Sequence, residues 1–238
     1  SKKEDGKNFY SQLPRKAYAS QDGLCCVDTL HRVTITGLEK NTTYFYRVLS
    51  QEVKELLPYR PVLGNIVSTD IWEKPLTFTT LDGRQETLSI VMINDIHGKN
   101  DLQKKLLEMA PPQNVDMVVF CGDMCNYINK QSDIFTGFLD TSVGLFASRK
   151  PFVYVRGNHE TRGAYARNFF RYLAGPEGKF YYAFTYGPIR FIVLDSGEDK
   201  PDTDVEYSGL VDFDNYILEQ KEWLARELES PEFRAASF

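Results

Sequence analysis

The pattern of hydrophobic and polar positions changes near residue 87 of the chain. Before that point, β-branched and aromatic residues gather in short runs separated by turn residues, at 33–37, 43–49 and 76–80. These runs have no helical period, so the first part is predicted to be all-β. Residues 1–20 offer no convincing paired strands, and a sandwich built here is expected to be incomplete at its N-terminal side.

Beyond residue 87 the pattern predicts strands alternating with helices. Three short, nearly continuous apolar runs have the character of strands buried on both faces: residues 88–93, 116–121 and 151–155. The segments between them, 101–110 and 132–147, carry their apolar residues on one stripe, as amphipathic helices do. This order predicts a parallel sheet with right-handed crossovers.

Four more elements are predicted toward the end of the chain. A helix is expected at 161–174, and strands at 180–186 and 189–194 are expected to form a hairpin around Tyr186-Gly187-Pro188. The last clear element is a helix at 219–229.

Composition is that of an ordinary globular protein. The chain has 238 residues, 42% hydrophobic and 26% charged, which is enough for one large domain or two smaller ones. The change of pattern favours two, at 1–82 and 88–238. No apolar stretch is long enough to span a bilayer, and the start has no signal-peptide pattern. Because the first residue is Ser1, the compartment stays open.

The net charge of −5 is unevenly spread. Eight acidic residues against one base, Lys200, lie between Asp195 and Asp214. Such a run is typical of a solvated loop, and the alternative is a loop beside a functional site. Nothing resembles the basic stripe of a nucleic-acid-binding surface, so nucleic acid is not expected as a partner. The four cysteines match no zinc or redox spacing.

Polar clusters follow the three strands of the predicted parallel sheet. They are Asn94-Asp95-Ile96-His97-Gly98, Gly122-Asp123 and Gly157-Asn158-His159-Glu160. Each alone has an ordinary alternative, since Asp and His are common in loops and Gly-Asp is a frequent turn dipeptide. Together they stand at the carboxyl ends of neighbouring strands, where open α/β sheets build their sites. Asp, His and Asn can hold a pair of divalent metals about 3.5–4 Å apart for in-line attack on phosphorus.

On these motifs, residues 88–229 resemble the calcineurin-like metallophosphoesterase superfamily, and Leu194-Asp195-Ser196-Gly197 and 220–224 also look like that family. Residues 37–44 and 78–80 resemble parts of a fibronectin type III module. The resemblance implies an α/β fold, an αββα-type sandwich that is incomplete in this chain, preceded by a partial all-β fibronectin III-like domain. This arrangement is similar to purple acid phosphatases.

One feature departs from the purple acid phosphatase pattern. That branch lacks the histidine of the Asp-x-His motif and uses a tyrosine ligand shortly after the second Asp. Here His97 is present, and Tyr127 lies one position later than that tyrosine would. A tyrosinate-iron site is therefore not expected.

The resemblance also assigns roles to the motif residues. Asp95 and His97 would bind the first of two divalent metals, Fe, Mn or Zn, and Asn158 would bind the second. Asp123 would bridge both, because a carboxylate offers two oxygens.

Two further residues would act on the phosphate ester substrate. His159 would not be a ligand but would stabilise developing charge or protonate the leaving oxygen. Arg162 would contact a phosphate oxygen, and its alternative is a solvated surface arginine. Asp195 is expected to be structural, and His31 to be a bystander.

The family pattern needs further histidines after the last helix, including a Gly-His-x-His pair. The chain has three histidines and stops at Phe238, so residues 1–238 alone are expected to hold metal weakly and to be inactive. The leading hypothesis is a two-metal phosphoesterase, and the alternative is a non-catalytic binding or structural protein that keeps the fold. The fibronectin-like module favours an extracytoplasmic location, while the substrate and oligomeric state stay open.

Overall fold

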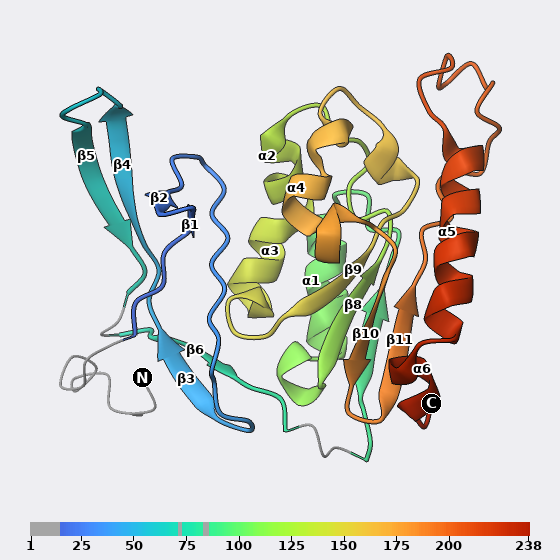
Figure 1. Ribbon diagram of the computed structural model, residues 1–238, viewed down its shortest axis with the longest axis horizontal. Helices are drawn as coiled ribbons and strands as arrows, with labels where there is room; N and C mark the ends of the chain where they lie inside the picture. Colours follow the sequence, from blue (N-terminus) through green and yellow to red (C-terminus); the bar gives the residue numbers. More distant parts are fainter. Residues whose placement is uncertain (1–14, 71–72, 83–85) are drawn as a thin grey trace. The chain divides into compact units, whose positions relative to one another are not determined.

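A computed structural model describes residues 15–70, 73–82 and 86–238 (Figure 1). The chain divides into two compact units, Ser1–Asp82 and Gly83–Phe238. Each unit is described by itself. Over the described residues, no helix is both long enough and apolar enough to cross a membrane.

The first unit is built from pairs of antiparallel strands, as its sequence predicts. The pairs are β1 (Ser20–Gln21) with β2 (Leu24–Cys25), β3 (Thr43–Tyr46) with β6 (Leu76–Thr79), and β4 (Leu49–Glu55) with β5 (Val62–Ser68). Tyr44 lies opposite Phe78 in the β3–β6 register, and their rings stack with centroids 5.7 Å apart. Such aromatic cross-strand pairs stabilise a two-stranded ribbon.

Two sequence predictions for this unit are wrong. The strand expected at 33–37 does not form: Val33 and Ile35 are each 45% exposed, and no strand of the described residues pairs with this segment. The hairpin β4–β5 was not predicted, and Ser20 belongs to a paired strand although 1–20 was expected to hold none. Residues 1–14 lie outside the described residues.

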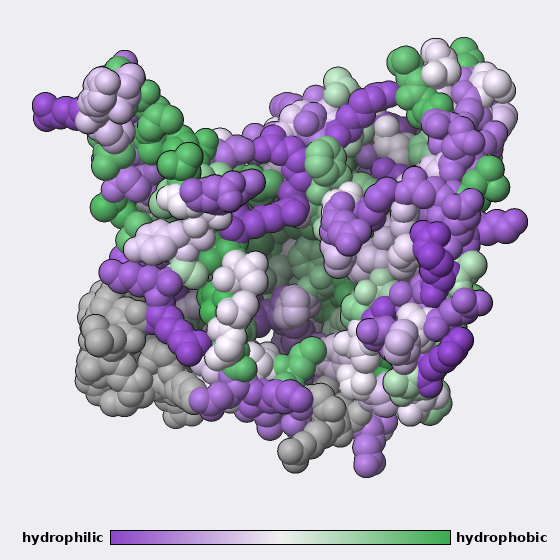
Figure 2. Space-filling model, in the orientation of Figure 1, coloured by the Kyte–Doolittle hydropathy of each residue, from purple (hydrophilic) through white to green (hydrophobic). Residues whose placement is uncertain are grey.

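No residue of 15–70 or 73–82 is buried within the structure. The exposed apolar side chains include Leu49, Ile66 and Val67 on the β4–β5 hairpin, where hydrophobic colouring gathers in Figure 2. Hydrogen bonds and ring contacts between paired strands therefore hold this unit, rather than a buried core.

The second unit contains the predicted three-stranded parallel sheet. Its strands are β7 (Ile90–Ile93), β8 (Met117–Cys121) and β9 (Phe152–Val155), in the order β7-β8-β9. Between β7 and β8 run α1 (Asn100–Met109) and the short 3-10 helix η2 (Pro112–Asn114). All three strands run the same way, so the parallel prediction is confirmed.

The second crossover is one helical segment, as predicted, but two of its turns are π-helical. It runs through α2 (Gln131–Ile134), η3 (Phe135–Leu139), α3 (Asp140–Ser142) and η4 (Val143–Ala147). Phe138, fully buried, reaches from η3 to the central strand, where its ring meets Phe120 edge-on at 5.7 Å. Each such buried aromatic side chain contributes about 1.5–3 kcal/mol through burial of apolar area.

A hairpin and a long helix cover the other face of the sheet. The strands β10 (Tyr182–Tyr186) and β11 (Ile189–Val193) pair as predicted, and α5 (Phe213–Leu228) and α6 (Pro231–Ala235) follow. The Tyr182 hydroxyl donates to the Tyr154 carbonyl of β9 at 3.0 Å, and Tyr181 packs on Trp223 of α5 at 5.1 Å. The unit is thus layered as helices, sheet, hairpin and helix (Figure 1).

The single helix predicted at 161–174 is wrong. This segment holds three short pieces, η5 (His159–Thr161), η6 (Ala166–Asn168) and α4 (Phe170–Leu173), followed by η7 (Pro176–Gly178). Gly163 interrupts it with φ +102°, a backbone conformation that no α-helix contains. A Cβ added there would lie 2.5 Å from the Ile128 carbonyl oxygen, so the chain passes another loop closely at this point.

Candidate metal centre

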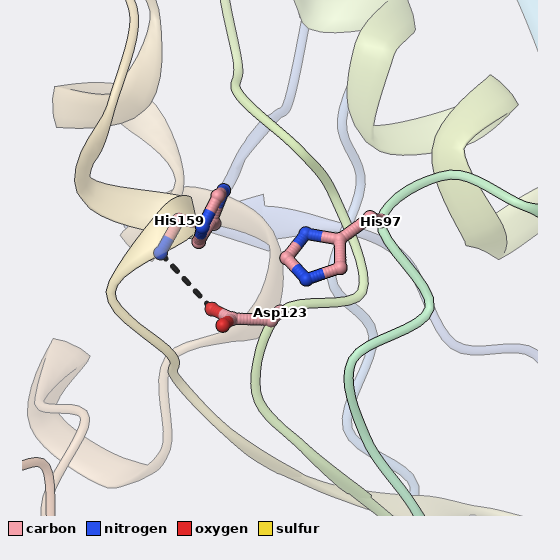
Figure 3. Close-up of side chains that lie close together, drawn as sticks. All are labelled: His97, Asp123 and His159. Atoms are coloured by element: carbon pink, nitrogen blue, oxygen red, sulfur yellow. Dashed lines mark hydrogen bonds between the residues drawn. The ribbon is translucent and has the colours of Figure 1, made fainter.

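The three polar clusters meet at the carboxyl ends of β7, β8 and β9. The loop after β7 lies along the loop after β8, because the His97 N–H donates to the Asp123 carbonyl at 2.8 Å and the Asp95 N–H to the Gly122 carbonyl at 3.2 Å. The third loop joins them through the His159 N–H, which donates to Asp123 Oδ1 at 3.0 Å, the dashed line in Figure 3. Segments distant in sequence therefore form one rim.

Three residues of this rim have left-handed backbones. The φ angles are 55° at Asp95, 49° at His97 and 55° at Asp123. Residues other than glycine pay of order 1–3 kcal/mol for such conformations, which concentrate at functional sites. Asp and His are among the side chains that tolerate them best.

Two glycines allow the second and third loops to approach each other. Gly122 has φ +82°, and a Cβ added to it would lie 2.8 Å from Gly157 Cα. A Cβ on Gly157 would collide with the backbone and carboxylate of Asp123. The side chain of Asp123 therefore occupies space that only glycine at 157 leaves open.

His97, Asp123 and His159 point toward one another (Figure 3). Each offers one ligand atom, and these atoms lie within 4.8 Å of one another. The two imidazole rings meet nearly at right angles, 74°, with centroids 4.4 Å apart. His97 Nδ1 is buried and has no hydrogen-bond partner among the described residues. A buried, unpaired imidazole nitrogen beside a carboxylate and a second imidazole fits a divalent metal such as zinc, iron or manganese.

Asp95 lies beside this group, at its exposed margin. Its Oδ1 is 3.7 Å from His97 Nε2, and its side chain is 62% exposed. The Asn94 side-chain amide donates to its other oxygen. Asp95 can therefore reach the same space as His97 while remaining open to solvent.

Asn158 and Arg162 are held by one carboxylate. Asn158 Nδ2 donates to Glu198 Oε1 at 2.7 Å, and Arg162 Nη2 donates to Glu198 Oε2 at 3.0 Å. The Arg162 side chain is 27% exposed and forms an ion pair with Glu198.

Hydrogen bonds at both nitrogens of His159 fix its tautomer. Nδ1 lies 2.8 Å from the carbonyl oxygen of Asn126, which can only accept, so Nδ1 carries the proton. Nε2 lies 3.3 Å from Arg162 Nη1, which can only donate, so Nε2 offers its lone pair. The ring is thus held with Nδ1 toward Asn126 and Nε2 toward Arg162.

A family model described as calcineurin-like phosphoesterase matches residues 88–235, more than half of the chain. The chain belongs to the calcineurin-like phosphoesterase family. The histidine and aspartate cluster lies within the matched residues.

Among solved structures, this chain is similar to the purple acid phosphatase PPD1 from yellow lupin (Lupinus luteus) seeds. The match has a TM-score of 0.48 and 19% identity, and covers 75% of this chain and 34% of the lupin chain. The chain thus spans about a third of that protein's length. No curated protein sequence matches it.

The sequence assigned no role to Glu160, which ties the loops of this rim together. Its fully buried carboxylate accepts from the backbone N–H groups of Asp123, Gly157 and Cys125, each at 3.0 Å. Burial raises the pKa of Glu160, and these donors together with the hydroxyl of Tyr154 oppose that rise. Its position as the last residue of Gly-Asn-His-Glu was the only available signal.

The acidic run is not simply a solvated loop. Glu198 has a side chain with no exposed surface. Lys200 Nζ lies 3.1 Å from Asp199 and 3.5 Å from Glu206, whose carboxylate is 3.8 Å from Arg162. Part of the run therefore flanks the site, which is the alternative left open by the sequence.

Asp195 and His31 lie where structural and bystander residues are expected. Asp195 is 1% exposed and pairs with Arg156 at 2.7 Å; burial raises the pKa of Asp195 while the guanidinium lowers it. His31 is exposed, in the other unit. The metal-centre residues thus remain those on the three loops.

Proposed function

We propose that this domain hydrolyses phosphate esters with two divalent metal ions, held in part by Asp95, His97, Asp123 and Asn158. One observation carries the proposal: two of the proposed ligands, His97 and Asp123, converge within 4.8 Å of each other and of the proposed acid, His159. In addition, His97 Nδ1 is buried and has no hydrogen-bond partner among the described residues. A buried imidazole nitrogen without a hydrogen bond is costly unless something binds it. A divalent metal, which the family implies, would be the partner of this His97 nitrogen.

The four proposed ligands would divide between the two ions. Asp123 would hold both ions with its carboxylate, and its place is fixed by the loops that hydrogen-bond to it. Asp95 and His97 would hold the first ion, and the acceptor oxygen of Asn158 the second. When bound, such a pair of ions supplies positive charge to the phosphate and lowers the pKa of a water molecule.

His159 and Arg162 act on the substrate. His159 Nε2 lies 3.3 Å from Arg162 Nη1, so a phosphate placed here would meet an imidazole and a guanidinium together. Arg162 would donate to a phosphate oxygen, and His159 would take up a proton from solvent at Nε2 and then deliver that proton to the leaving oxygen. Proton transfer of this kind contributes roughly 10²–10⁴-fold to rate.

The first test is metal-dependent hydrolysis of p-nitrophenyl phosphate by the protein. Activity with Mn, Fe, Zn or Mg is expected for wild type and loss of both metal and activity for Asp123→Asn. Absence of hydrolysis with every metal would favour the non-catalytic alternative.

A second test separates the role of a ligand from that of an acid. His159→Asn is expected to keep the metals while lowering turnover by roughly 10²–10⁴. The matched control is His31→Asn, because His31 is exposed and lies in the other unit; it should leave both quantities unchanged. Loss of metal in His159→Asn would make His159 a ligand instead.

A further inference from the structure

Glu198 differs from Asp199 and Glu206, its acidic neighbours, in being buried and shared between two partners. Its side chain has no exposed surface, whereas Asp199 next to it is 72% exposed. One carboxylate oxygen, Oε1, accepts from Asn158 Nδ2 at 2.7 Å and from the backbone N–H of Asp199 at 3.0 Å. The other, Oε2, accepts from Arg162 Nη2 at 3.0 Å and Nε at 3.3 Å. A buried charge is normally paired, and here both oxygens are used.

The bond to Asn158 decides which way its amide faces. An amide has one oxygen, which can ligate a cation, and one NH₂ group, which cannot. A carboxylate can only accept, so Glu198 selects the orientation in which Nδ2 faces it. Asn158 Oδ1 then faces away from Glu198 and is available to a metal ion.

The bond to Arg162 reaches the catalytic histidine. Two Arg162 nitrogens are held by Glu198 Oε2, and the third, Nη1, lies 3.3 Å from His159 Nε2. Glu206 also faces Arg162, but at 3.8 Å and with a half-exposed side chain. Glu198 therefore fixes the guanidinium plane, and Glu206 adds only a solvent-screened charge.

We infer that Glu198 is a positioning residue that sets the amide of Asn158 for metal binding and the guanidinium of Arg162 beside His159. The inference rests on the proposed function, because it gives Asn158 Oδ1 a metal to hold. Partners that orient metal ligands from outside the coordination sphere typically change affinity 10–100-fold when removed.

Glu198→Gln tests the orientation directly. The Gln amide keeps its oxygen toward Arg162, so its NH₂ faces Asn158, whose amide must turn to accept from it. The metal then meets an NH₂ group. Calorimetric titration with Mn²⁺ compares the variant with the wild-type protein. One of the two ions should bind about 10–100-fold more weakly to Glu198→Gln.

A compensating substitution distinguishes orientation from a merely structural role. In Glu198→Gln with Asn158→Asp, the new carboxylate accepts from the Gln NH₂ with one oxygen and offers the other to the metal, so Mn²⁺ affinity should recover. Asn158→Asp alone sets two carboxylates against each other and should bind more weakly than the double variant. Glu206→Gln is the matched control and should bind as wild type does.

The outcomes separate the two proposals. A wild-type protein that binds no Mn²⁺ overturns the proposed function, whatever the variants do. Wild-type binding with an unchanged Glu198→Gln overturns the role of Glu198. A double variant no better than Glu198→Gln also overturns it, because orientation then fails to explain the loss.

Discussion

Replacing Glu160 by glutamine should loosen the rim on which the metal centre stands. The carboxylate has two acceptor oxygens and receives three backbone N–H groups, those of Asp123 and Gly157 on Oε2 and that of Cys125 on Oε1. Glutamine has a single acceptor oxygen. If that oxygen keeps Asp123 and Gly157, its NH₂ is pressed against the N–H of Cys125.

The magnitude follows from the bonds that change. A hydrogen bond to a charged acceptor contributes about 1.5–3 kcal/mol, and a buried N–H left unpaired costs about 1–3 kcal/mol. A neutral amide is easier to bury than a carboxylate, whose burial raises the pKa of Glu160, so part of this loss is offset. The net expectation is a loss of about 1–3 kcal/mol in the free energy of unfolding.

Urea unfolding measures that loss, and amide hydrogen exchange locates it. The N–H of Cys125 should exchange faster in Glu160→Gln, since it is the donor that loses its acceptor. Glu222→Gln is the control, because Glu222 is exposed on α5 and should change stability by no more than about 0.5 kcal/mol. A Glu160→Gln protein as stable as this control, with exchange at Cys125 unaltered, would refute the reasoning.

Two further predictions follow from the loops and the thiols. Gly157→Ala should destabilise the protein by about 1–3 kcal/mol in thermal unfolding, because the added Cβ would collide with the carboxylate of Asp123. The control is Gly144→Ala, which places its Cβ in open space on a helix and should be neutral or stabilising. Burial and two nearby carboxylates raise the pKa of Cys125 to about 12, so at about pH 8 its thiolate is scarce. A thiol reagent should label exposed Cys25 and Cys26 in the native protein and Cys125 only after unfolding; rapid native labelling of Cys125 would contradict this.

The parallel sheet could be predicted because its signal is local. Continuous apolar runs mark strands that are buried on both faces, and β8 shows why: Val118 and Phe120 have no exposed surface. The start of α5 could not be predicted, because the side chain of Asp202 accepts from the backbone N–H groups of Phe213 and Asp214. Because Asp202 belongs to the loop before the helix, the apolar pattern at 219–229 predicts a helix that is shorter than α5.

The residues of the candidate site also fall into those that the sequence predicts and those that it does not. The clusters containing Asp95, Asp123 and Asn158 stand next to strands in sequence, so their meeting follows from the order of the sheet. Glu198 lies 40 residues from Asn158, and nothing in its acidic surroundings distinguishes it from solvated neighbours. The helix predicted at 161–174 failed for a related reason, because Gly163 is fixed by a distant loop and not by the residues beside it.

The left-handed backbones of Asp95 and Asp123 restrict how this domain can change by mutation. At such positions asparagine and glycine fit almost without strain, while β-branched side chains do not. Asp→Asn is one base change in either aspartate codon, removes the charge and leaves the backbone in place. A folded descendant that lacks one of these charges is thus one mutation away, whereas a β-branched residue at either position would add backbone strain of order 1–3 kcal/mol. Asparagine is therefore the substitution to look for in sequences that have kept this domain for binding alone.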